Sequence, residues 1–160
     1  MRRVLNVGTA LFLATTVLAG TQAGAQLADK KVLTLAAAKK MAAAAEAEAT
    51  KNSWRVVIAI VDDGGHLLYL QRTDETQIGS IDIAIGKATT SVALKRPSKA
   101  VEDIIAGGRN AFLGVKGMTP LQGGLPIMVD NKLVGAIGVS GVTSQQDEQI
   151  AKAGLEALVK

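Results

Sequence analysis

The chain has 160 residues, with 18 Lys and Arg against 14 Asp and Glu, one histidine and no cysteine. This length suits a single domain with its own hydrophobic core. The lack of cysteine excludes disulfides, thiol nucleophiles and thiolate metal sites, and a single histidine excludes a multi-histidine zinc centre. Aromatic residues make up only 2% of the chain, which argues against a base-stacking nucleic-acid surface.

The first 25 residues are typical of a secretory signal peptide. Arg2 and Arg3 precede an apolar run, and Ala23-Gly24-Ala25 forms an A-x-A cleavage pattern before Gln26. The apolar run is too short for a membrane anchor. Two arginines alone do not distinguish general secretory from twin-arginine export.

We therefore expect one mature domain of residues 26–160, periplasmic or secreted, with no membrane span after cleavage near Ala25. Removing Arg2 and Arg3 lowers the formal net charge from +4 to +2. Such a small excess does not predict nucleic-acid binding.

The first half of the mature chain predicts a helix, a hairpin and a second helix. Residues 34–50 are rich in alanine, and Thr34 suits the N-cap position. Residues 54–61 are rich in β-branched residues and predict a largely buried strand, which the turn 62–65 joins to an antiparallel strand at 66–72. Apolar residues at helical spacing predict a helix over 80–94.

The second half predicts a short helix, a hairpin and a last helix after a stop at Pro97. Ser98 suits the start of a short helix to about residue 106, and a glycine-rich loop follows over 109–124. A second hairpin is expected at 125–129 and 132–139, and Ser144-Gln145-Gln146-Asp147 resembles a capping box that opens the last helix. The order α-β-β-α-α-β-β-α predicts an α+β fold with an antiparallel sheet flanked by helices.

Three common catalytic signatures fail. Six residues separate Gly79 from Gly86-Lys87, where a phosphate loop has four. The segment Gly138-Val139-Ser140-Gly141-Val142 ends in valine, where a nucleophile elbow has glycine. No Gly-x-Gly-x-x-Gly follows a strand and opens a helix, so a dinucleotide site has no support.

A set of short segments follows in a specific order along the chain. They are Val61-Asp62-Asp63-Gly64-Gly65-His66-Leu67, Arg72-Thr73-Asp74, Ser80-Ile81 with Ala84 and Lys87-Ala88, Arg96-Pro97-Ser98, Gly123-Gly124-Leu125-Pro126-Ile127, Val134-Gly135-Ala136-Ile137-Gly138-Val139-Ser140-Gly141, Gln146-Asp147 and Ala153-Gly154-Leu155. This set resembles the GlcG/HbpS family of heme-binding proteins, also called the haem-degrading domain family, over about residues 32–158. The resemblance implies an antiparallel sheet flanked by helices, a homo-oligomer and heme as the ligand. Thr73 and Val142 depart from the Met and Gly that are frequent in the family.

For a heme ligand, His66 is the strongest iron-binding candidate, because a neutral imidazole nitrogen ligates ferric porphyrins. The plainer interpretation is a surface histidine at the start of a strand. Met118 offers a thioether and Thr119 a hydroxyl, although a loop methionine more often covers apolar surface.

Heme propionates require cations or backbone donors. Arg72 and Lys87 are candidates, although Arg72 has Asp74 as an alternative partner and Lys87 suits a solvated helix face. Gly123 and Gly124 would let a planar ligand approach the backbone, and tight turns explain them equally well.

Two further classes of function stay open at this point. Arg72, Asp74 and Lys87 would form the site of an isomerase, lyase or decarboxylase that acts on a small carboxylate, if burial turned Lys87 into a base. A non-catalytic accessory module that binds a protein partner is the third class. The family resemblance favours a binding protein for heme, or for another small planar or carboxylate ligand, over an enzyme, and leaves open whether heme is degraded or only bound.

Overall fold

A computed structural model describes residues 27–159. The predicted signal peptide, residues 1–25, lies outside the described residues. The elements are α1 (Leu35–Lys51), β1 (Val57–Asp62), β2 (Leu67–Arg72), α2 (Ser80–Leu94), α3 (Lys99–Ala106), the 3-10 helix η1 (Asn110–Gly114), β3 (Gly124–Val129), β4 (Lys132–Ser140) and α4 (Ser144–Val159). The predicted α+β class and element order are confirmed, and η1 lies within the predicted glycine-rich loop.

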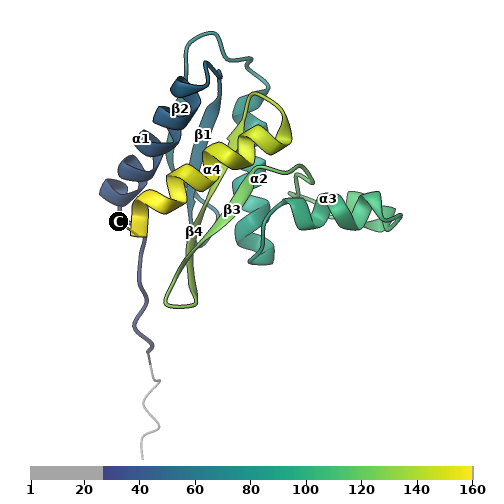
Figure 1. The fold of residues 1–160 in the computed structure, drawn as a ribbon. Coiled ribbons are helices and arrows are strands. Elements are labelled where there is room, and N and C mark those ends of the chain that lie inside the picture. Colours follow the sequence, from purple (N-terminus) through teal and green to yellow (C-terminus); the bar gives the residue numbers. More distant parts are fainter. Residues whose placement is uncertain (1–26, 160) are drawn as a thin grey trace, which may run out of the picture.

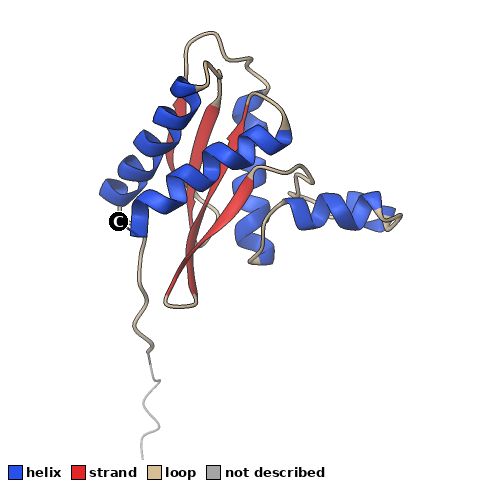
Figure 2. Cartoon of the chain, in the orientation of Figure 1, coloured by secondary structure: helices blue, strands red, loops and turns tan. Residues whose placement is uncertain are grey.

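The four strands form one antiparallel sheet in the order β2-β1-β4-β3. Helices α1 and α4 cover one face of this sheet, and α2 covers the other (Figure 1). The strands therefore lie between two helical layers (Figure 2). Both hairpins turn at the same end of the sheet, because β1 and β4 run antiparallel as neighbours.

The larger part of the core lies between the sheet and the pair α1 and α4. Thr34 accepts a hydrogen bond from the Ala37 amide at 3.2 Å and caps α1, as the sequence predicts. The helix then buries small side chains, among them Ala38, Ala42 and Ala45, so that it packs closely on its neighbours.

On the other face, α2 lies with its backbone directly on β4. A Cβ atom at Gly138 would overlap the Ala84 carbonyl oxygen and would lie 2.7 Å from the Ala88 nitrogen. Glycine in the strand and alanines in the helix are therefore what this separation requires. The close approach fixes which α2 side chains reach past the edge of the sheet.

The segment formed by α3 and η1 projects from the side of the molecule (Figure 1). Within α3, Val101 is the one fully buried side chain. On the same segment Leu113 and Val115 are exposed. We call residues 99–115 the arm.

Among the described residues, none of the helices combines the length and the apolar character that crossing a membrane requires.

Candidate functional site

The turn between β1 and β2 carries the only histidine, and Asp62 organises it. One oxygen of Asp62, Oδ1, accepts the amide N–H groups of Gly64 and His66, each at 2.9 Å. The same oxygen lies 3.4 Å from Nδ1 of the His66 ring. These donors, with the His66 amide first among them, hold the pKa of Asp62 below its usual value. Asp62 is thus a carboxylate that faces one nitrogen of the ring.

The imidazole of His66 is 82% exposed. Its other nitrogen, Nε2, has no hydrogen-bond partner within residues 27–159. A Cβ atom at Gly64 would lie 2.8 Å from Nδ1 and 3.0 Å from Cε1, so a glycine at this position lets the ring fold back towards Asp62. The turn therefore presents an oriented, solvent-facing imidazole.

The histidine turn and the glycine-rich loop flank α2 on two sides. A Cβ atom at Gly65 would lie 3.8 Å from the Thr89 methyl group. On the other flank, the Thr119 amide donates to the Thr90 hydroxyl at 2.8 Å. The structure thus brings the turn and the loop to consecutive residues of α2. Met118, which is half-buried, precedes Thr119 in this loop.

Lys87 points from α2 into the protein and is 2% exposed. Its Nζ atom donates to Asp147 Oδ2 at 2.7 Å and to the Val139 carbonyl at 2.9 Å. The Val139 amide donates to the Gly123 carbonyl, and β3 begins only at the next residue. Lys87 therefore donates to a carbonyl of β4 beside the residue at which β3 starts. Through Asp147 it also links α2 to the first turn of α4.

Both groups of this ion pair are out of solvent, since the Asp147 side chain is 3% exposed. Burial raises the pKa of Asp147, and the Lys87 ammonium group and the Val142 amide oppose that rise. Each charge compensates the other in a region of low dielectric, so removal of one partner leaves an unpaired buried charge.

Gly123 and Gly124 lie against this pair. A Cβ atom at Gly123 would lie 2.9 Å from Lys87 Nζ, and one at Gly124 would overlap the Lys87 carbonyl. In this structure the two glycines let Lys87 and the backbone of α2 approach the start of β3 closely. Their role in ligand binding, like that of Lys87, remains a prediction.

Arg72 lies at the far end of β2 from His66, about 20 Å away along the strand. Arg72 and Asp74 are both exposed, and neither has an ion-pair partner among the described residues. Lys87 has the burial that a base requires, but its ammonium group is already held by Asp147. Arg72 and Asp74 are thus exposed, whereas Lys87 is buried. An enzyme site that uses all three residues remains a prediction.

The sequence assigns Asp147 to a capping box, and this assignment is wrong. The box is shifted by one residue, because Thr143 and Gln146 exchange the hydrogen bonds that open α4. Asp147 is instead the partner of Lys87. The sequence did contain a signal for the burial of Lys87. Its position, three residues after Ala84 and next to Ala88, places it on the apolar face of the helix, and both alanines are buried.

Comparison with known proteins places the chain in a family. The family model described as "Haem degrading protein HbpS-like" matches residues 33–156. The chain belongs to this HbpS-like family. Protein GlcG of Escherichia coli strain K12 is 43% identical to this HbpS-like chain over 111 residues, which cover 69% of the chain and 83% of GlcG.

Two solved structures share the HbpS-like fold. A double mutant of HbpS from Streptomyces reticuli matches with a TM-score of 0.79 at 32% identity, covering 94% of this chain and 99% of that one. A complex of PduOC with heme matches with a TM-score of 0.73 at 27% identity, covering 79% of this chain and 95% of that one.

The buried pair of this HbpS-like chain predicts a large effect of Lys87→Met on stability. The substitution leaves the Asp147 carboxylate buried without a cation, which costs about 3–5 kcal/mol in the free energy of unfolding. Urea unfolding measures this loss. The matched control is Lys99→Met, because Lys99 pairs with Asp103 at 2.6 Å on an exposed helix face. We expect little change for the control, and equal losses in the two variants would contradict the assignment.

The loss in Lys87→Met also depends on pH. Burial raises the pKa of Asp147, so the folded state binds its proton more tightly than the unfolded state, and acid favours folding at this residue. Without Lys87 this effect grows. The deficit relative to the natural protein is therefore largest near neutral pH and shrinks as acid protonates the stranded carboxyl group. A deficit that does not change with pH in urea unfolding would show that Asp147 is not the stranded charge.

Proposed function

We propose that this HbpS-like chain binds heme, with His66 as the iron ligand, and handles heme outside the cytoplasm. The observation that carries the proposal is the exposed imidazole of His66, held from behind by Asp62. The family and the likeness to the PduOC:heme complex support the choice of ligand. The predicted signal peptide supports the location.

The turn fits the chemistry that a ferric porphyrin requires. Iron-binding histidines commonly have a carboxylate or carbonyl on the second ring nitrogen, which orients the ring and raises its basicity. Asp62 is in that position relative to Nδ1, and Nε2 is free to bind. A bound heme would supply redox chemistry at the iron, and the chain would supply the axial nitrogen and its orientation. Met118 and Thr119, on the other flank of α2, are the alternative ligands.

A titration of hemin into protein that lacks residues 1–25 tests this function. We expect a saturable shift of the Soret band at micromolar protein. His66→Ala removes the imidazole, so we expect at least a tenfold weaker affinity and an altered spectrum. The comparison variant is Thr119→Val, which removes the competing hydroxyl and leaves the turn intact. No Soret shift in the natural protein would refute heme binding.

A second variant separates ligation from general damage to the turn. In Gly64→Ala the new methyl group takes the space of the His66 ring and turns the imidazole away from Asp62. We expect a hemin affinity between those of the natural protein and His66→Ala. In the control, Gly79→Ala, the methyl group meets no atom within 4 Å. An identical spectrum and affinity in His66→Ala and the natural protein would exclude His66 as the ligand.

The proposal includes assembly into a homo-oligomer through the arm. Exposed Leu113 and Val115 on a projecting segment suit an interface between copies of the chain, because such side chains gain from removal of water. Sedimentation velocity measures the assembly, and we expect Leu113→Asp to shift it towards the monomer. A natural protein that is monomeric at all concentrations would contradict this part.

A further inference from the structure

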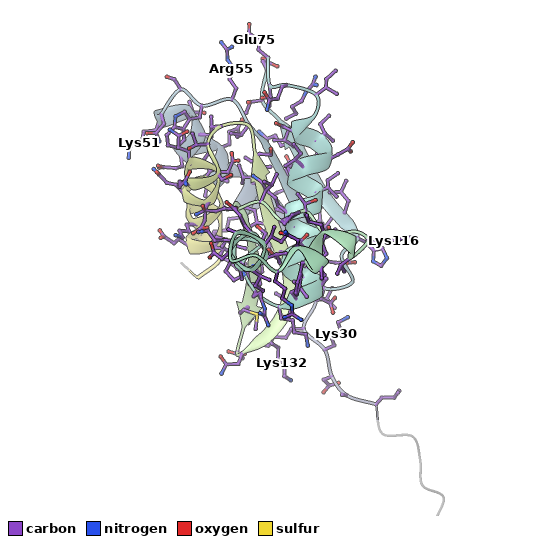
Figure 3. The ribbon with its side chains drawn as sticks, turned by 90° about the vertical axis from the view of Figure 1, so that its right-hand side faces the viewer. Lys30, Lys51, Arg55, Glu75, Lys116 and Lys132 are labelled. Carbon is purple, nitrogen blue, oxygen red and sulfur yellow. The ribbon has the colours of Figure 1, made fainter. Side chains whose placement is uncertain are left out.

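A hollow of about 400 Å³ lies where the two hairpins turn and α2 ends. It is lined by Asp63, Lys95, Met128, Asn131, Lys132 and Leu133. Figure 3 shows Lys132 and Lys30 at this end of the molecule, opposite Arg55 and Glu75. The hollow is therefore built by three separate parts of the chain: the turn that carries His66, the end of α2 and the hairpin of β3 and β4.

Defined turns position the lining side chains. Lys95 follows α2 in a left-handed conformation with φ of 51°, and its amide donates to the Val92 carbonyl at 3.2 Å. Asp130 and Asn131 have φ values of 49° and 59°, which is the pair that a tight two-residue hairpin turn requires. The backbone under both lysines is thus fixed by hydrogen-bonded structure.

The charge of the hollow is positive. Asp63 pairs with Lys30, and the neighbouring Asp130 pairs with Lys31. Lys95 and Lys132 have no carboxylate within ion-pair distance in the part of the chain that the structure describes. Lys132 also acts on Asp130, whose pKa it helps to lower. Four lysines, Lys30, Lys31, Lys95 and Lys132, thus face the two carboxylates of Asp63 and Asp130, and this excess of positive charge attracts an anion.

Two of the side chains that line the hollow, Met128 and Leu133, are apolar. Leu133 packs against the buried cluster of Val61, Ala88 and Ala136, and Met128 leaves part of its thioether side chain exposed. Apolar side chains beside two lysines in one hollow suit a ligand that has an apolar body and carboxylates at its edge. Heme, with two propionates on one side of its ring, has this chemistry.

We propose that Lys95 and Lys132 bind the propionate carboxylates of the heme that His66 ligates, an inference that rests on the proposed function. His66 does not line the hollow, but it lies on the same turn as Asp63, which does. This turn and the turn before Lys132 lie at the same end of the sheet. Ammonium groups form charge-assisted hydrogen bonds with carboxylates. This assignment takes the place of the distant Arg72 and the buried Lys87 as partners of the propionates.

The test compares hemin with hemin dimethyl ester, whose propionates are uncharged. Binding of both is measured for the natural protein, for the double variant Lys95→Gln and Lys132→Gln, and for the control Lys116→Gln, an exposed lysine that follows η1. We expect the double variant to bind hemin about tenfold more weakly, with a smaller dependence on salt, and to bind the ester as the natural protein does. The control binds both ligands unchanged.

The outcomes separate the two claims. If the natural protein binds hemin and the double variant binds it equally well, the propionate subsite is refuted and heme binding by His66 stands. If the double variant loses hemin and ester alike, the lysines do not act through the carboxylates, and the subsite is again refuted. If the natural protein binds neither ligand, both the subsite and the proposed function fail.

Discussion

The backbone of α2 lies on the backbone of β4, and the other features of the molecule depend on this contact. Gly138 in the strand leaves room for the carbonyl oxygen of Ala84 in the helix. At this separation the next turn of α2 carries Lys87 past the start of β3, where it meets Asp147 and the Val139 carbonyl. A larger residue at position 138 would lift the helix and separate the buried ion pair.

The same placement of α2 decides where a ligand is able to bind. The middle of α2 packs on the sheet and carries the ion pair. A ligand is therefore left with the turn at Gly65, the loop at Thr119 or the end of the helix at Lys95. The turn at Gly65 is the histidine turn, which adjoins the hollow. The proposed heme site uses Nε2 of His66 and the lysines at this end, and it leaves the Lys87 pair intact.

Local patterns were sufficient for the elements but not for the site. The spacing of apolar residues predicts α2 over 80–94, and the structure has the same bounds. His66 was predicted as the iron ligand because it is the only histidine. Asp147 was missed because its partner is 60 residues away, and a neighbouring Thr-Gln pair gives the capping signal. The proposed Lys95 and Lys132 were not among the candidates from the sequence, because two separate turns bring them to one hollow and no periodicity within one segment encodes that meeting.

The central claim is that heme binds at the histidine turn beside the end of α2. Ferric iron broadens the NMR signals of nearby backbone amides, so spectra with saturating hemin, compared with those of the diamagnetic gallium porphyrin, locate the metal on the chain. The account predicts the strongest broadening at residues 63–67, with Lys95 and residues 130–132 next. The strongest broadening at residues 117–124, with an unaffected histidine turn, would contradict it.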